Sequence, residues 1–155
     1  MDYEERIRKL GIEIPEAPKP VAEYLPAKRI ERLVFCSGQG PVIEGKIIHK
    51  GKLGAEKTIE EGYEAAKICV LNCLSAAKEL IGTLNQVDEI IKVTGFVNSS
   101  PDFFDQPKVI NGASDVLVKI FGDKGRHARC AIGTSILPGN ISVEVELILS
   151  LRETS

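Results

Sequence analysis

The chain has 155 residues and a mass of 16.9 kDa, the length of one ordinary domain. Its 20 basic and 22 acidic residues leave a net charge of −2, which argues against a protein that mainly binds the phosphate backbone of nucleic acids. Hydrophobic residues make up 43% and charged residues 27%, the composition of a soluble folded protein. No apolar run approaches the roughly 18–20 residues of a membrane span, so no membrane partner is expected.

The N-terminus and the cysteines indicate the compartment. The first residues, MDYEERIRKLG, are charged and lack the apolar segment of a signal peptide, so a cytoplasmic location is expected. A reducing compartment predicts free thiols for the four cysteines, which also lack the paired CxxC spacing of a zinc site. The chain has no tryptophan and only 5% aromatic residues, which weakens any base-stacking surface for single-stranded nucleic acid.

The N-terminal segment differs in composition from the rest of the chain. Residues 2–10 predict a short charged helix that ends at Gly11, and residues 15–20 (PEAPKP) are a proline-rich connector. We therefore divide the chain into a helix and connector, 1–17, and a single domain, 18–155.

The strongest helix signal lies at 58–81. Thr58 and Glu61 have the spacing of a capping box, in which each side chain satisfies a free backbone N–H of the other residue. The apolar residues that follow recur at the interval of one buried helical stripe, and Cys69 and Cys73 fall on it. We predict a core helix whose two thiols are buried.

The remaining elements complete an α+β pattern. The sequence predicts strands at 30–36, 87–97, 129–137 and 141–150, a short extended stretch at 46–49, and a second helix at 107–121. The turn Leu137-Pro138-Gly139-Asn140 predicts that the last two strands form a hairpin. The order of elements predicts a mixed β-sheet with two helices packed on one face.

Arg129 is the first candidate for chemistry. It begins a predicted strand just after a glycine-rich loop, where its guanidinium could hold a carboxylate through two parallel hydrogen bonds. A surface salt bridge is the alternative. Strand alternation places Arg129 on one face with the small residues Ala131 and Gly133, which leaves room for a polar pocket, and Cys130 on the other face, which predicts a buried thiol.

Glu144 is the second candidate. It lies on the polar face of the last predicted strand, where a carboxylate could position or deprotonate water, although a solvated sheet edge would carry the same pattern. A plain hairpin would put Glu144 opposite Gly133 and about 13 Å from Arg129, so the pair would need a bulge or a second subunit to cooperate. His127 could serve as a general base, but a structural role is the commoner one for a lone loop histidine.

The C-terminal motifs resemble the signature of the RidA/YjgF family. They are GRHARCAIG at 125–133, Leu137-Pro138, and VEVE at 143–146. Upstream pieces agree in order and spacing: Tyr24, FCSGQGP at 35–41, FVN at 96–98 and VIN at 109–111. The resemblance covers about residues 18 to 150. Segment 42–54 and the run FVNSSPDFFDQPKVINGASD resemble a longer YjgF-like subgroup, often named endoribonuclease L-PSP.

The resemblance implies a chorismate-mutase-like α+β fold and a homotrimer with pockets between neighbouring subunits. The best-known activity of the family is hydrolysis of reactive 2-imino or enamine acids to 2-keto acids and ammonia. That chemistry needs no metal and no cofactor, because fixing the substrate carboxylate and placing one water over the electrophilic carbon gives catalysis by proximity.

The resemblance also implies roles for individual residues. Arg129 matches the arginine that grips the substrate carboxylate, and Glu144 matches the glutamate associated with the attacking water. The other implied substrate-binding residues are Tyr24, Ser37 and Asn111, with a backbone contact from Gly38 and with Cys130 and Ala131 standing where deaminating members carry serine and cysteine.

Two other function classes remain open. A non-catalytic protein that binds small carboxylates, with a regulatory role, would keep the arginine and lack turnover. An endoribonuclease is suggested only by the name of the subgroup, and the acidic net charge and few aromatic residues argue against it.

Overall fold

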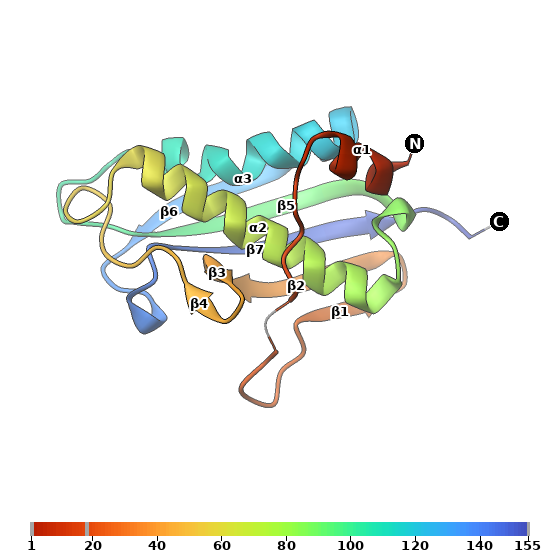
Figure 1. The fold of residues 1–155 in the computed structure, drawn as a ribbon, viewed down its shortest axis with the longest axis horizontal. Helices are drawn as coiled ribbons and strands as arrows, with labels where there is room; N and C mark the ends of the chain where they lie inside the picture. The colour runs from red at the N-terminus through yellow and green to blue at the C-terminus, as the bar shows by residue number, and fades with distance from the viewer. Residues whose placement is uncertain (1, 18, 155) are drawn as a thin grey trace.

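A five-stranded mixed sheet organises the computed structural model, which describes residues 2–17 and 19–154 (Figure 1). The strand order is β1-β2-β7-β5-β6, in which only β5 and β6 run parallel. The strands are β1 (Ala27–Ile30), β2 (Leu33–Gln39), β5 (Val87–Asn98), β6 (Ala128–Thr134) and β7 (Val143–Leu151), with a separate small hairpin of β3 (Val42–Ile43) and β4 (Lys46–Ile47). The domain boundary predicted at residue 18 lies outside the described residues.

Two long helices cover one face of this sheet, as predicted. They are α2 (Ile59–Ile81) and α3 (Gln106–Phe121), and Figure 1 shows both in front of the strands. The hydrophobic core lies between the helices and the sheet and includes Leu74, Leu117 and Leu147, all fully buried. Cys69 and Cys73 lie in this core, which confirms their predicted burial.

Local signals explain where α2 begins and ends. The Glu61 N–H donates to the Thr58 hydroxyl at 3.2 Å, and the Thr58 N–H donates to the Glu61 carboxylate at 3.1 Å, so the predicted capping box is confirmed. Gly82 follows the helix at φ 91°, a conformation that side chains other than glycine rarely adopt.

The close approach of α2 and α3 depends on Gly112. A Cβ atom at this position would collide with the backbone carbonyl of Tyr63 in α2. Tyr63 in turn donates its hydroxyl hydrogen to the Asp115 carboxylate at 2.7 Å, one turn further along α3. A small residue and a polar contact therefore fix α3 against α2, and α3 carries two residues of the site described below.

The predicted N-terminal helix is α1 (Tyr3–Lys9), capped by the Asp2 carboxylate, which accepts from the Glu5 N–H at 2.9 Å. Tyr3 and Ile7 are buried in the main core. The Tyr3 ring packs edge-on against Phe121 at the end of α3, with 4.7 Å between the ring centroids.

Two predictions about the strands are wrong. The last two strands do not form a hairpin, because β5 lies between β6 and β7 and pairs with both. The predicted strand at 30–36 is two strands, β1 and β2, which fold back on each other through a tight turn in which Glu31 has φ 52°.

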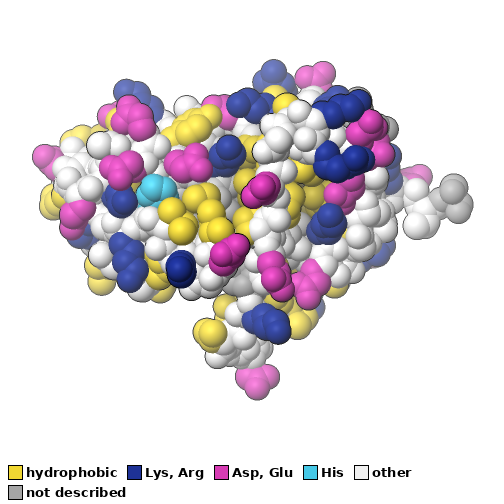
Figure 2. Space-filling model, viewed as in Figure 1, with side chains coloured by type: hydrophobic (Ala, Val, Ile, Leu, Met, Phe, Trp, Pro, Cys, Tyr) yellow, Lys and Arg dark blue, Asp and Glu magenta, His cyan; other side chains and the backbone are white. Residues whose placement is uncertain are grey.

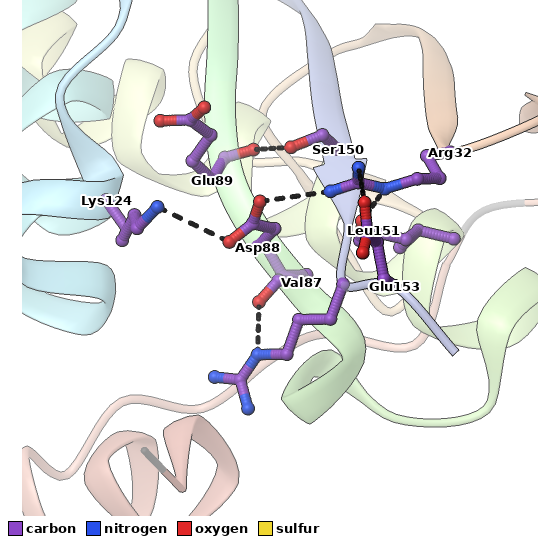
Figure 3. Close-up of polar contacts among 9 residues, drawn as sticks. Arg32, Val87, Asp88, Glu89, Lys124, Ser150, Leu151 and Glu153 are labelled. Atoms are coloured by element: carbon purple, nitrogen blue, oxygen red, sulfur yellow. Dashed lines mark hydrogen bonds and ion pairs between the residues drawn. The ribbon is translucent and has the colours of Figure 1, made fainter. Parts of the chain in front are cut away.

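Arg32 in that turn joins three parts of the chain at one end of the sheet (Figure 3). Its guanidinium donates to the Leu151 carbonyl at 2.8 Å and pairs with Asp88 at 3.3 Å and Glu153 at 3.2 Å. Asp88 also pairs with Lys124 at 3.4 Å. This network holds the turn against the start of β5 and the end of β7, at the point where the sequence predicted one continuous strand.

The two faces of the molecule differ in character. On the helical face, Figure 2 shows acidic and basic side chains interspersed, with hydrophobic groups between them. On the other face the chain leaves the sheet uncovered, and Phe35 of β2 and Ile132 of β6 are each 43% exposed there. Within the described ranges, 2–17 and 19–154, the helices are all too short or too polar to cross a bilayer.

Candidate functional site

A cavity of about 470 Å³ opens on the uncovered sheet face, beside the loop that precedes β1. Tyr24 from this loop and Ser37 from β2 both line it, so the structure brings these two predicted pocket residues together. The Ser37 hydroxyl donates to the Leu25 carbonyl at 2.6 Å and thereby fixes the loop that carries Tyr24. Four polar residues that the sequence analysis missed also line the cavity, namely Glu23, Lys28, Lys92 and Thr94, and Glu146 of the VEVE motif lines it too.

A β-bulge places Gly38 against Glu144. Cys36 pairs with Leu147 and Gln39 with Val145, so two residues of β2 oppose one residue of β7. A Cβ atom at Gly38 would lie 3.0 Å from the carboxyl carbon of Glu144. Glycine therefore leaves the space that the Glu144 carboxylate occupies, and these two predicted site residues are neighbours.

The surroundings of Glu144 favour its neutral form. The side chain is half-buried, and burial raises the pKa of its carboxyl group. The Glu146 carboxylate, two residues along the same face of β7, raises this pKa further by charge repulsion. A carboxylate with a raised pKa accepts a proton more readily than an ordinary surface glutamate.

Arg129 lies at the far edge of the sheet, on β6, with its side chain over α3. Its Nη1 donates to the Asn111 amide oxygen at 2.8 Å and to the Ser114 hydroxyl at 3.1 Å, which uses both hydrogens of that nitrogen. Within residues 2–17 and 19–154, no acidic side chain forms a salt bridge with Arg129, and its Nε and Nη2 donate to no protein acceptor. Asn111 and Ser114 thus hold the guanidinium through Nη1, and the edge formed by Nε and Nη2 is the kind of donor pair that can bind a carboxylate through two parallel hydrogen bonds.

Ser114 was missed by the sequence analysis, and His127 was favoured there only as a structural residue. The His127 Nε2 lies 2.9 Å from the Ser114 hydroxyl, and its Nδ1 lies 2.7 Å from the Gly125 carbonyl. Ser114 could have been noticed from its helical spacing, because residues three apart share a helix face and Asn111 was already a candidate.

Within one chain, the two groups of predicted residues remain apart. Arg129 is level with Val93 of β5 and Glu144 with Phe96, and β5 separates their strands. With strands about 4.8 Å apart and a rise of about 3.3 Å per residue, the two Cα atoms are roughly 14 Å apart. Arg129 also shares the helix side of the sheet with buried Val93, whereas Glu144 is on the uncovered side. Glu144 is therefore not opposite Gly133, as the expected hairpin would have placed it.

The residues that follow Arg129 lie on opposite faces of β6. Cys130 is exposed, so the prediction of a buried thiol is wrong. Strand alternation had assigned it correctly to the face of Ile132, but that face is the uncovered one. Ala131 is half-buried and packs against the core, so its side chain has little freedom to meet a ligand.

The other thiols are poor nucleophiles. Cys36 borders the cavity, but burial raises its pKa to about 12. The thiols of Cys69 and Cys73 donate to the carbonyls of Val143 and Val145, and burial raises the pKa of both well above the usual value. In the described part of the chain, no three His, Cys, Asp or Glu side chains gather as ligands for a metal.

Comparison with known proteins agrees with the fold. Residues 4–151 match the family described as "YjgF/chorismate_mutase-like, putative endoribonuclease". Protein TCP17 of Trypanosoma cruzi is 39% identical over 147 residues, which span 94% of this chain and 92% of that protein.

Solved structures of other proteins also share this fold. The protein Atu1372 of Agrobacterium tumefaciens, of unknown function, superimposes with a TM-score of 0.89 at 38% identity and covers 97% of this chain and 92% of its own. Escherichia coli TdcF, solved with bound serine, has the same fold at 21% identity and a TM-score of 0.61, covering 89% of this chain and 94% of its own. Because the family match spans nearly the whole chain and the strand order and helix placement fit it, this protein belongs to the YjgF family and has its chorismate-mutase-like fold.

Proposed function

We propose that this protein is a cofactor-free hydrolase that converts small reactive 2-imino or enamine acids to 2-keto acids and ammonia. The observation that carries the proposal is the outer edge of Arg129. Its Nη1 is held by Asn111 and Ser114, and the Nε and Nη2 donors find no acceptor among the described residues. A guanidinium fixed in this way is preorganised for the carboxylate of a small acid.

The proposed pocket is completed by a second subunit of a homotrimer. Arg129 and Asn111 lie at the β6 edge, while Tyr24, Ser37, Gly38 and Glu144 belong to the β2 and β7 side. If the β6 edge of one subunit meets the β2 side of the next, the two groups face each other across the interface. The exposed Phe35 and Ile132 on the uncovered sheet face support such an assembly, because large apolar groups favour burial between subunits.

In the proposed reaction, Arg129 binds the carboxylate of the 2-imino acid and Glu144 accepts a proton from a water molecule. The water oxygen forms a bond to the imine carbon, and Glu144 passes the water proton on to the imine nitrogen, which gives a carbinolamine. Glu144 then accepts the proton of the new hydroxyl group and delivers it to the amino nitrogen as the carbon–nitrogen bond breaks, so that the 2-keto acid forms and ammonia leaves. One water is consumed and no electrons are exchanged. The raised pKa of Glu144 suits both the acceptance and the return of the proton.

Serine bound to TdcF supports a small-molecule role, since serine carries the carboxylate that Arg129 would bind. The Ala131 methyl packs against the core, so Ala131 would not contact a ligand through its side chain. In the proposed pocket one backbone N–H group of Cys130 or Ala131 contacts the ligand, because successive residues of an edge strand point their N–H groups to opposite sides.

The test is ammonia release from 2-iminobutanoate generated in situ, measured for the wild type and for Arg129→Ala. We expect acceleration by the wild type and its loss in the variant. No acceleration by the wild type, together with 2-ketobutyrate binding that disappears in Arg129→Ala, would instead indicate a non-catalytic carboxylate binder. RNA cleavage that survives repurification and is abolished by Glu144→Ala would indicate a nuclease.

A further inference from the structure

The hydrogen bonds behind Arg129 have a fixed direction. The Gly125 carbonyl can only accept, so the His127 Nδ1, 2.7 Å away, must carry a hydrogen and donate it. In a neutral imidazole, Nε2 is then an acceptor, and the Ser114 hydroxyl, 2.9 Å away, donates to it. The same Ser114 oxygen accepts from the Arg129 Nη1 at 3.1 Å. A single chain of donors therefore runs from Arg129 through Ser114 and His127 to the Gly125 carbonyl.

Burial and the neighbouring Arg129 cation favour the neutral form of the His127 imidazole. Burial lowers the pKa of His127, and the Arg129 cation lowers it further, while the hydrogen bond to the Gly125 carbonyl acts in the opposite direction. The 3-10 turn before β6 contains the exposed Asp123 and Lys124, and Arg126 follows it. Asp123 pairs with Arg126 at 3.6 Å and Lys124 with Asp88 at 3.4 Å. The element that packs over His127, α3, contributes the uncharged Ser114 hydroxyl.

We propose that Ser114 and His127 are positioning residues that fix the rotation of the Arg129 guanidinium. They act with Asn111 to occupy Nη1, so that Nε and Nη2 present a preset edge to the ligand carboxylate. Without His127 the Ser114 hydroxyl is free to turn, and without Ser114 the guanidinium loses one of its two supports. The identity of the ligand rests on the function proposed above. The chain of hydrogen bonds from Arg129 through Ser114 and His127 to Gly125 does not depend on that function.

The test measures the affinity for 2-ketobutyrate by calorimetry. We expect Ser114→Ala and His127→Leu each to weaken binding about fivefold, the usual effect of losing one hydrogen bond. His127→Gln keeps an acceptor within reach of Ser114 and should bind nearly as well as the wild type. His49→Leu, which alters the other histidine of the sequence, is the matched control and should bind like the wild type.

The double variant Ser114→Ala/His127→Leu separates positioning from general destabilisation. If His127 acts through Ser114, the double variant binds no more weakly than Ser114→Ala alone. Additive losses, unchanged single variants, or a glutamine variant as weak as the leucine variant would each overturn the proposal.

The NMR signal of the Arg129 Nε–H gives a second readout that needs no ligand. We expect it to shift or broaden in Ser114→Ala and His127→Leu and to stay sharp in His127→Gln. If the wild type fails to bind 2-ketobutyrate, the proposed function fails, and this signal alone then decides whether Ser114 and His127 hold the guanidinium. An Arg129 signal that is identical in all variants would contradict the positioning role.

Discussion

The three nitrogens of the Arg129 guanidinium have different roles: Nη1 donates to Asn111 and Ser114, and Nε and Nη2 are left to bind a ligand in the proposed function. A lysine at the same place would carry the positive charge on a single nitrogen. It could not donate to Asn111 and Ser114 from one nitrogen and present two parallel donors to a carboxylate from two further nitrogens, as the guanidinium can. Asn111, expected to line the pocket, accepts from the Arg129 Nη1 through its amide oxygen. Part of its effect on ligand binding would therefore come through the arginine.

Arg129→Lys should weaken 2-ketobutyrate binding about tenfold or more, because the bidentate hydrogen bonds are lost while the positive charge remains. Calorimetry at constant ionic strength measures the change. Arg126→Lys, three residues earlier and exposed, is the matched control and should bind like the wild type. Equal affinities for Arg129→Lys and the wild type would mean that charge alone attracts the ligand.

The Glu144 carboxyl group makes the stability depend on pH. Its pKa is raised in the folded state, so the folded protein binds this proton more tightly than the unfolded chain does. The stabilisation from the protonated group is fully present below the ordinary glutamate pKa and is lost as the pH rises through the raised value. Glu144→Gln removes the charged form and should melt a few degrees above the wild type at pH 7, with the difference vanishing near pH 4.

Thermal melts at the two pH values test this prediction, with Glu79→Gln as the control, because Glu79 is exposed on α2. A glutamine variant that is less stable than the wild type at pH 7 would show that the charged Glu144 stabilises the fold.

At the scale of elements, local signals were readable from the sequence and long-range pairing was not. The capping box and the apolar stripe predicted α2 to within one residue, because both depend on neighbours along the chain. The Leu137–Asn140 turn looks like a hairpin turn, but strand pairing is decided by the whole sheet, and β5 enters between β6 and β7. Alternation assigned Cys130 to the right face but could not tell which face the helices cover.

The α2–α3 interface gives a prediction at this scale. Gly112→Ala would force a methyl group against the Tyr63 carbonyl, so the helices must separate. We expect a loss of about 3 kcal/mol in the free energy of unfolding, the upper part of the usual range for overpacking. Urea denaturation measures it, and exposed Lys119→Ala on the same helix should change stability little. A variant as stable as the wild type would mean that the interface accommodates the extra carbon.

For the whole molecule, the sequence predicted the residue types of the site but not their distribution over the fold. The resemblance grouped Arg129, Asn111, Tyr24, Ser37 and Glu144, yet one chain holds the first two together at the β6 edge and the other three on the β1, β2 and β7 side of β5. No pattern along a single sequence encodes which edges meet when subunits assemble. The acidic net charge argues against nucleic-acid binding, and the exposed Phe35 and Ile132 on the uncovered sheet face favour the self-association proposed above.

Complementation between two inactive variants tests most directly whether Arg129 and Glu144 act from different subunits. Arg129→Ala and Glu144→Gln chains are refolded together in equal amounts, and ammonia release from 2-iminobutanoate is compared with that of each variant alone. In a cyclic trimer, random mixing restores both residues in about a quarter of the pockets, so the account predicts about a quarter of the wild-type activity. Mixed trimers that are no more active than the separate variants would contradict it.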